Sequence, residues 1–265
     1  MKREPIKFDE VPFEISDYVG VIKNIQFPRQ GHTSDVGIIE TENIMFVLKR
    51  TIGKQFCSWL SKEEVVLNCL SKTNLLTPNI YKFIEQKSAT QSWILMEYIE
   101  GDTLRNYLFN ETHQDKKHEI IYSFGKILSD IHSTVCPSEL IYGTRWLDEM
   151  LIQAEYNLMN YNVDGSKDLL NSLKKNKPKP FEQTLIHGDF TIDNVLVKEG
   201  KITGIIDWSG GAYGDPRYDV SLAVRPKPGA FESDIEVGIF FEGYGKKIIS
   251  DEEYRYFEAG LYSFF

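Results

Sequence analysis

The chain has 265 residues, of which 42% are hydrophobic, and its formal net charge at pH 7 is −9. Such a chain can bury a large core, and its length is one at which a core tends to divide into two lobes. The negative charge argues against nucleic acid or an anionic membrane as its main partner.

The cysteines and the start of the chain bear on location. Cys57, Cys69 and Cys136 are odd in number and lack the close spacing of metal ligands, so we expect them to be reduced. No apolar run approaches the length of a membrane span, and the charged start of the chain is not followed by the apolar segment of a secretory signal. We therefore expect a cytoplasmic protein, monomeric or weakly dimeric, without a nucleic-acid or membrane partner.

The first hundred residues predict several strands and one helix. Residues 19–27 and 36–39 are strand-like, and the loop between them contains turn-forming residues. Its small side chains and backbone amides could fold over nucleotide phosphates, although an ordinary β-turn has the same pattern. A further strand, residues 43–49, ends at Lys49.

Glu63 is the most informative residue of the predicted helix over 63–72. Ser61-x-x-Glu64 resembles a capping box at the start of this helix. Glu63 extends the apolar stripe of the helix, and a carboxylate on a core-facing stripe needs a partner because an unpaired buried charge is costly. Lys49 is the natural candidate. The alternative is that Glu63 lies in the first helical turn, where it interacts with the helix dipole and water.

Residues 79–85 and 92–98 predict a strand pair that ends in a glycine-containing corner before Leu104. Exposed backbone groups at this corner could pair with an adenine edge. Beyond it the chain becomes helical, with apolar stripes over 120–131 and 147–158 and a capping box, Ser250-x-x-Glu253, before a terminal helix. The predicted boundary therefore divides the chain into residues 1–97 and 98–265.

The strongest motif is His187-Gly188-Asp189 followed by Asn194 and, after a short hairpin, Asp207. Residues 195–197 and 202–206 predict the two strands, and residues equally far from the turn should lie side by side. Asn194 and Asp207 should therefore face each other at the open end. Phosphoryl transfer needs a group to orient the attacking hydroxyl and two oxygen ligands for magnesium. The alternative is that the aspartates form turns and Asn194 caps a strand.

These residues together resemble the aminoglycoside phosphotransferase family of small-molecule kinases, especially the aminoglycoside 3′-phosphotransferase branch. The resemblance runs through Lys49, Glu63, the segment 95–98, the motif at 187–194 and Asp207, and continues to Tyr218-Asp219-Val220. It implies an α+β, bilobal protein-kinase-like fold. Residues 1–97 would form a β-rich N-lobe that binds the nucleotide, and residues 98–265 a mostly helical C-lobe with the catalytic and acceptor sites.

The resemblance also implies roles for single residues. Asp189 is expected to be the catalytic base, and Asn194 and Asp207 to bind Mg²⁺. Lys49, held by Glu63, is expected to bind the phosphates of ATP, with GTP as the alternative nucleotide. Asp219 would brace the catalytic loop. The remaining cofactor-binding residues are expected in the phosphate-covering loop and along the adenine edge: Gly31, His32, Thr33, Ser34, Met96, Glu97 and Ile99.

The chain departs from that branch where antibiotics bind. No carboxylate side chain follows Glu258, Gly210 replaces an arginine, and Val47 replaces an adenine-stacking aromatic residue. We therefore expect an ATP- and Mg²⁺-dependent transfer to a hydroxyl of a small molecule, such as an amino sugar or another cationic alcohol. Acidic residues between 146 and 164 are candidates for the acceptor pocket. The alternatives are a catalytically silent nucleotide-binding pseudokinase and a kinase with a macromolecular acceptor.

Overall fold

The computed structural model describes residues 5–28 and 33–265 and divides the chain into two compact units, Met1–Glu100 and Gly101–Phe265. Each unit is described by itself. The division falls close to the boundary that the sequence predicts between residues 97 and 98. The predicted phosphate-loop residues Gly31 and His32 lie outside the described residues.

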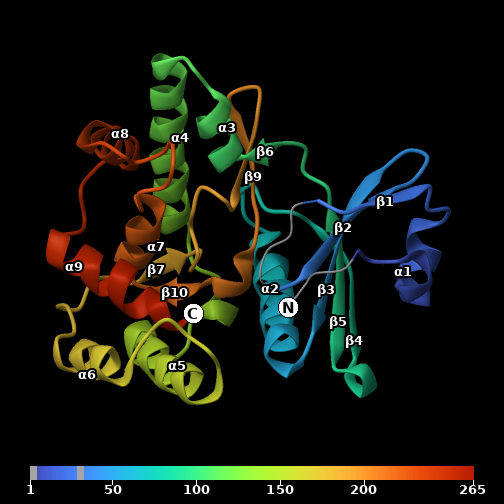
Figure 1. Ribbon diagram of the computed structural model, residues 1–265, viewed down its shortest axis with the longest axis horizontal. Coiled ribbons are helices and arrows are strands. Elements are labelled where there is room, and N and C mark those ends of the chain that lie inside the picture. Colours follow the sequence, from blue (N-terminus) through green and yellow to red (C-terminus); the bar gives the residue numbers. More distant parts are fainter. Residues whose placement is uncertain (1–4, 29–32) are drawn as a thin grey trace. The chain divides into compact units, whose positions relative to one another are not determined.

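The first unit is built on one antiparallel sheet of five strands (Figure 1). Their order across the sheet is β1-β2-β3-β5-β4. The strands are β1 Asn24–Gln26, β2 Asp35–Glu40, β3 Met45–Ile52, β4 Ile80–Gln86 and β5 Gln91–Glu97. The short 3₁₀ turns are η1 Phe8–Glu10 and η2 Lys87–Ala89.

Side chains alternate between the two faces of the sheet along each strand, so each face presents its own set of apolar residues. One helix packs against each of these sets. On β5, Trp93 and Leu95 pack in the cluster that contains Ile15 of α1, Phe13–Val19. Ile94 and Met96, one residue out of phase, pack with Leu60 of α2, Lys54–Leu70. The expected strand over 19–27 is correct only for 24–26, since its first residue, Val19, ends α1.

The predicted start of α2 was wrong. The helix begins at Lys54, directly after Gly53, which has a φ of 99° and serves as its N-cap. Ser61 therefore lies inside the helix, and its hydroxyl donates to a carboxylate oxygen of Glu85 on β4 at 3.2 Å. Ser61 and Glu64 resembled a capping box because sequence alone does not show that the preceding turns are stabilised by packing against the sheet.

The second unit is mostly helical, with two small antiparallel sheets (Figure 1). Its helices are α3 Leu104–Asn110, α4 Gln114–Ser133, α5 Trp146–Asn160, α6 Lys167–Lys175, α7 Pro216–Ala223, α8 Asp234–Tyr244 and α9 Asp251–Arg255. Strands β6 Asp102–Thr103, β8 Val195–Lys198 and β9 Lys201–Ile205 form one sheet, and β7 Thr184–Ile186 and β10 Ala212–Gly214 the other. Short 3₁₀ turns are η3 Ser138–Leu140 and η4 Trp208–Gly210.

Helices α4 and α8 lie against each other, and two glycines set how closely they approach (Figure 1). A Cβ on Gly125 of α4 would overlap the carbonyl oxygen of Phe240, and one on Gly243 of α8 would overlap that of Tyr122. Beside this contact, the rings of Phe124 and Phe190 stack with centroids 4.7 Å apart. The close approach of the two backbones therefore supports the aromatic core next to the catalytic motif.

The predicted capping box of the last helix is confirmed. The Ser250 hydroxyl accepts from Glu253 N–H, and the Glu253 side chain accepts from Ser250 N–H. Helix α9 ends at Arg255, and the chain continues through a π turn, η5 Tyr256–Gly260, into a 3₁₀ turn, η6 Leu261–Phe264. This last turn is fixed on α5, because the Asn157 side-chain amide donates to the Phe264 carbonyl at 2.9 Å.

Two further expectations concern the chain as a whole. Within residues 5–28 and 33–265, no helix has both the length and the apolar character required to cross a bilayer. The three cysteines are not joined in disulfides, which agrees with the expectation that they are reduced.

Candidate functional site

Lys49 and Glu63 form the ion pair that the sequence predicts. The Lys49 ammonium lies 2.7 and 3.0 Å from the two carboxylate oxygens of Glu63. Lys49 is 7% exposed and Glu63 2% exposed. The alternative, a solvated Glu63 in the first helical turn, is wrong because α2 begins at Lys54. Lys49 lies inside β3 rather than at its end.

The predicted hairpin is present, with a shift in its register. Strand β8 pairs with β9 so that Val195 lies opposite Ile205, and an irregularity follows between Leu196 and Val197. The Ile206 N–H donates to the Asn194 carbonyl at 2.9 Å, so Asn194 pairs with Ile206 and not with Asp207 as expected. Asp207 is the next residue and has a left-handed backbone with φ 68°. Such a conformation is strained for most residues and occurs often at functional sites.

Asp189 is the point at which the three polar groups of the motif interact. The Asn194 side-chain amide donates to the Asp189 carbonyl at 2.8 Å and to carboxylate Oδ2 at 2.9 Å. Burial, followed by repulsion from the Asp207 carboxylate, raises the pKa of Asp189 to about 7. The hydrogen bond from Asn194 acts in the opposite direction. The fold therefore assembles an amide and two carboxylates at one place.

The chemistry of these groups fits a magnesium ion. Because Nδ2 of Asn194 is bonded to Asp189, Oδ1 is the side-chain atom that remains to bind a cation. A cation would also offset the repulsion between Asp189 and Asp207. Among the residues that the structure describes, no three His, Cys, Asp or Glu side chains are grouped to hold a metal alone. Mg²⁺ commonly uses one or two protein oxygens and takes its other ligands from water and phosphate.

Asp219 holds the backbone at the start of the motif that runs from His187 to Asn194. Its fully buried carboxylate accepts from the backbone N–H of His187 at 2.6 Å and of Gly188 at 2.8 Å. His132 lies 3.4 Å from the same carboxylate, and its other ring nitrogen lies 2.7 Å from the Tyr244 hydroxyl. His132 is therefore a buried core residue of α4 whose two ring nitrogens both have partners.

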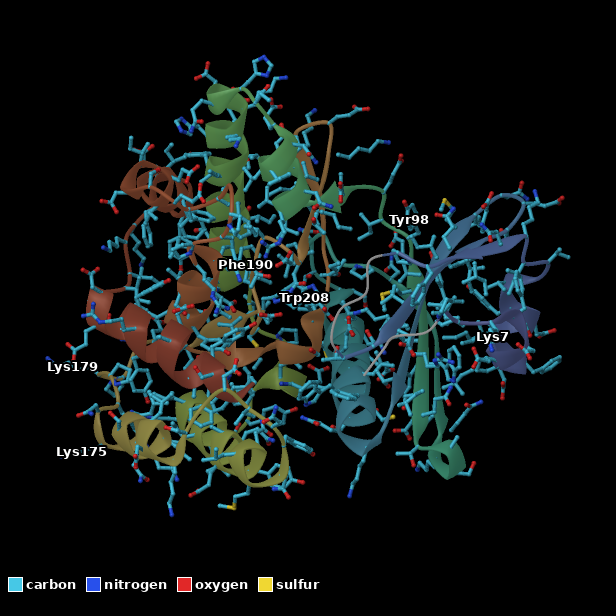
Figure 2. The ribbon with its side chains drawn as sticks, in the orientation of Figure 1. Lys7, Tyr98, Lys175, Lys179, Phe190 and Trp208 are labelled. Atoms are coloured by element: carbon cyan, nitrogen blue, oxygen red, sulfur yellow. The ribbon has the colours of Figure 1, made fainter. Side chains whose placement is uncertain are left out.

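The ring of His187 is part of the same core. It packs against Phe190 and Trp208, with centroid distances of 5.9 and 4.5 Å, and its Nε2 lies 3.0 Å from the Ile206 carbonyl. Figure 2 labels Phe190 and Trp208. This side chain links the segment before Asp189 to the segment before Asp207. It therefore helps to hold the segments that carry Asp189 and Asp207 together.

Three contacts at or near Asp189 were not predicted from the sequence. The Tyr262 hydroxyl donates to Oδ1 of Asp189 at 3.3 Å, and the Arg225 guanidinium lies over the Tyr262 ring, 5.3 Å from its centroid. Arg105 forms an ion pair with Asp193 in the catalytic loop. Residues so far apart in sequence give no spacing signal, and aromatic residues near the terminus are most simply interpreted as core.

The other predicted nucleotide-binding residues lie in the first unit. Ser34 is buried and Thr33 half-buried, immediately before β2. Met96 is buried in β5. The Glu97 N–H donates to the Asn79 carbonyl at 2.8 Å, so this N–H is already used within the unit. An adenine edge would therefore depend on other backbone groups of Glu97 and Ile99.

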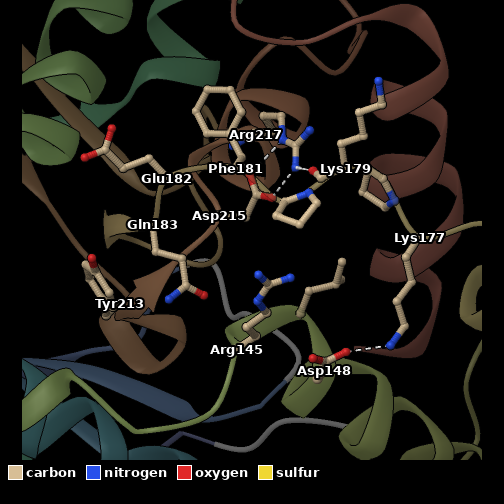
Figure 3. Close-up of a pocket in the computed structure, with 13 residues that line it drawn as sticks. Arg145, Asp148, Lys177, Lys179, Phe181, Glu182, Gln183, Tyr213, Asp215 and Arg217 are labelled. Carbon is tan, nitrogen blue, oxygen red and sulfur yellow. Dashed lines mark hydrogen bonds and ion pairs between the residues drawn. The ribbon is translucent and has the colours of Figure 1, made fainter.

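The second unit also contains a pocket of about 540 Å³, which is lined by none of the residues predicted as the base, as metal ligands or as nucleotide-binding residues (Figure 3). It lies among the start of α5, the segment 177–183 and the residues around β10. Arg145 and Gln183 point into it, while Lys177 pairs with Asp148 at 2.5 Å (Figure 3). Asp148 was a candidate for the acceptor pocket, and this contact gives it an internal partner.

The raised pKa of Asp189 predicts how pH affects stability when metal and nucleotide are removed. Below about pH 4 the Asp189 carboxyl is protonated in both the folded and the unfolded state, and its favourable contribution to the free energy of unfolding is fully present. As pH rises to about 7, the unfolded chain ionises freely while the folded protein resists ionisation, so this contribution is lost. In EDTA, Asp189→Asn should therefore raise the melting temperature little at about pH 4 and increasingly towards about pH 7.5.

The exposed Asp130→Asn variant on α4 is the control, and its difference from wild type should not follow this curve. A constant difference between Asp189→Asn and wild type from pH 4 to about 8 would contradict the prediction.

Known proteins resemble this chain in sequence and in fold. A profile of the phosphotransferase enzyme family matches residues 46–256. An aminoglycoside 3′-phosphotransferase of Niallia circulans is 25% identical over 174 residues, which cover 62% of this chain and 64% of that protein. This chain thus spans about three fifths of the length of the curated aminoglycoside 3′-phosphotransferases that it matches.

Solved structures show the same fold at low identity. The gentamicin complex of APH(2″)-IIa has a TM-score of 0.66 and 17% identity, covering 89% of this chain and 82% of that one. Spectinomycin phosphotransferase APH(9)-Ia, solved with ADP and spectinomycin, has a TM-score of 0.63 and 20% identity, covering 96% and 84%. The expected α+β, protein-kinase-like fold is confirmed by this similarity.

Proposed function

This chain belongs to the phosphotransferase enzyme family, and we propose that it is a kinase that transfers the γ-phosphoryl group of ATP to a hydroxyl of a small molecule. The family membership confirms the resemblance inferred from the sequence. The identity of the nucleotide, with GTP as the alternative, and the acceptor are parts of the proposal. The observation that carries it is the contact of Asp189 with Asn194 beside Asp207.

Each unit contributes different groups to the proposed reaction. In the first unit, Lys49, held by Glu63, would bind the α- and β-phosphates, and Thr33 and Ser34 would lie in the phosphate-covering loop. The backbone of Glu97 and Ile99 would hold adenine. In the second unit, Asn194 and Asp207 would hold Mg²⁺, which neutralises charge on the phosphates when it is bound.

Asp189 has the chemistry required of the base. Its carboxylate would accept the proton of the acceptor hydroxyl as the new oxygen–phosphorus bond forms. The bond between the γ-phosphorus and the oxygen bridging to the β-phosphate breaks, and the nucleoside diphosphate leaves with that electron pair. Asn194 and Tyr262 each donate to one carboxylate oxygen of Asp189, so both would orient the base toward the acceptor.

A catalytically silent pseudokinase is the alternative in a different class. It would keep the nucleotide-binding residues without a need for a base held by Asn194 and Asp219. Transfer of ³²P from γ-labelled ATP to any acceptor, lost in an Asp189 variant, would separate the two functions. A macromolecular acceptor would require labelling of protein or nucleic acid in the same assay.

Nucleotide binding should raise the melting temperature in a metal-dependent way. At a concentration of about one hundred times the dissociation constant, MgATP should stabilise the folded protein by roughly 2.7 kcal/mol, or about 5–10 °C for a chain of this size. Lys49→Met should reduce this shift, because the ammonium that binds the phosphates is lost. Thermal melting with ATP or GTP, with and without EDTA, tests whether nucleotide binding requires the metal and which of the two nucleotides is preferred. Equal melting temperatures with and without MgATP and MgGTP would count against the proposal.

A further inference from the structure

A group of charged side chains in the second unit surrounds the residue that contacts the proposed base. Tyr262 touches Asp189, and Arg225 lies over the Tyr262 ring. Nε of Arg225 is 2.6 Å from a carboxylate oxygen of Glu258. If Asp189 accepts the proton of the acceptor hydroxyl, as the proposed function requires, this group borders the place where the acceptor binds.

Lys227 lies in a tight turn next to the catalytic loop. The Cα of Phe109, on α3, is 3.6 Å from the position that a Cβ on Gly229 of this turn would occupy. The first residues of α3 are attached to the catalytic loop, because the Arg105 N–H donates to the Ile192 carbonyl at 2.9 Å. The turn, α3 and the catalytic loop therefore form one continuous surface.

The charges on this surface do not balance. Those that act on Lys227 are two guanidinium groups, Arg225 and Arg105, and two carboxylates, Asp193 and Glu258. Both carboxylates already have a partner, since Asp193 pairs with Arg105 and Glu258 with Arg225. Lys227 is half-buried, and its ammonium forms no ion pair or hydrogen bond with any residue in 5–28 or 33–265. The surplus positive charge is therefore at Lys227.

The environment of Lys227 disfavours its charge in the absence of a ligand. Burial, and then repulsion from Arg225 and Arg105, lower the pKa of Lys227. A desolvated cation near two other cations is costly unless an anion is bound, and such costs are typical of binding sites. An anionic group at this position would gain a charge-assisted hydrogen bond and offset the repulsion.

Two of the four acidic residues between 146 and 164, the candidates for binding an ammonium group, already pair with lysines of the same unit. Asp148 pairs with Lys177 at 2.5 Å, and Glu155 pairs with Lys174 at 2.8 Å. A polycationic acceptor would have to compete with these lysines for the carboxylates. It would also meet the repulsion of Arg225 and Lys227 beside Asp189.

We propose that Lys227, with Arg225 beside it, binds an anionic group of the acceptor, which is therefore a hydroxyl compound bearing a phosphate or a carboxylate. This inference rests on the proposed function and names an anionic acceptor in place of the cationic alcohol expected from the sequence. An anionic group at Lys227 can belong either to the acceptor or to the γ-phosphate of the nucleotide, and the experiment distinguishes the two.

The test uses calorimetry on the full chain saturated with MgADP and, separately, with the magnesium complex of the non-hydrolysable analogue AMP-PNP. The first four probes share one pyranose skeleton and differ in charge: glucosamine, glucose, glucuronate and glucose 6-phosphate, with kanamycin as a polycation. Glucose 6-phosphate or glucuronate should bind at least about tenfold more tightly than glucose or glucosamine with either nucleotide. Lys227→Met should remove this preference, and Lys227→Glu should reverse it in favour of glucosamine.

Lys246→Met is the control, since Lys246 is an exposed lysine in the same unit that lies outside this cluster. It should leave the preference unchanged. The inference would be overturned if neither anionic probe bound measurably, if glucosamine or kanamycin bound wild type most tightly, or if Lys227→Met kept the preference. A smaller melting shift with MgAMP-PNP but not with MgADP in Lys227→Met would place the γ-phosphate at Lys227, which also overturns it. Failure of wild type to respond to MgATP at all would instead remove the proposed function.

Discussion

Phosphoryl transfer should fall by about a thousandfold when Asp189 is replaced by asparagine, because general-base catalysis contributes roughly 10²–10⁴ to such rates. Asparagine has nearly the same shape but cannot accept the hydroxyl proton. The melting shift produced by MgATP should remain, since Lys49, Asn194 and Asp207 are unchanged. A coupled assay of ADP formation with the preferred acceptor measures the rate, and thermal melting measures nucleotide binding.

Asp130→Asn is the matched control for this loss. Asp130 is an exposed aspartate on α4 that pairs only with Lys126, at 3.7 Å, within its own helix. Its removal should leave the rate within about twofold of wild type, because surface pairs of this kind contribute little. Turnover by Asp189→Asn within about tenfold of wild type would exclude Asp189 as the base and would favour a role in metal binding alone.

Gly125→Ala should destabilise the second unit by roughly 2–4 kcal/mol. The new methyl group would overlap the Phe240 carbonyl oxygen and lie 2.9 Å from the Tyr244 backbone nitrogen, so α4 and α8 would have to separate. Overpacking of a tightly packed contact typically costs about 1–3 kcal/mol, and more where backbone atoms must move. The melting temperature should fall by roughly 5–10 °C.

Gly238→Ala on α8 makes the same chemical change, and we expect it to have the opposite effect on stability. Nothing lies within 4 Å of a Cβ at Gly238, and the residue is exposed within the helix. Alanine there should stabilise the protein by about 0.5–1 kcal/mol, since glycine is costly inside a helix. Equal effects of the two substitutions on the melting temperature would show that the close approach at Gly125 does not limit the packing of α4 and α8.

Separation of α4 and α8 should also affect the site. Helix α8 carries Tyr244, and α4 carries His132, which lies beside Asp219. Asp219 in turn holds the backbone of His187 and Gly188. At temperatures where Gly125→Ala remains folded, its rate of phosphoryl transfer should therefore fall more than that of Gly238→Ala.

The sequence predicted the parts of the protein whose signals are local. The hairpin after Asn194 has two apolar runs around a Glu-Gly turn, and the capping box at Ser250 lies within four residues. The pair of Lys49 and Glu63 followed from a single carboxylate on an apolar stripe. In each case the residues that decide the structure are close together or occupy one periodic pattern, so the physical rule can be read directly along the chain.

Other features depended on contacts that no local pattern contains. Helix α2 begins well before Ser61 because its first turns pack on the sheet, and the short helices α3 and α7 have too few residues for a periodic signal. A register irregularity in the hairpin places Asn194 opposite Ile206. Local helix propensities and turn-forming residues determine the structure less strongly than such packing contacts do.

The sequence by itself predicted the groups proposed as a base, as two metal-binding oxygens and as a lysine paired with a glutamate, because these groups form a motif with fixed spacing. Only the tertiary structure decided what surrounds Asp189: Tyr262 on its carboxylate, Arg225 over that ring, and Lys227 in the neighbouring turn. Charges act through space and not along the chain, so the balance of cations and carboxylates that we propose selects the acceptor exists only after folding has brought these segments together.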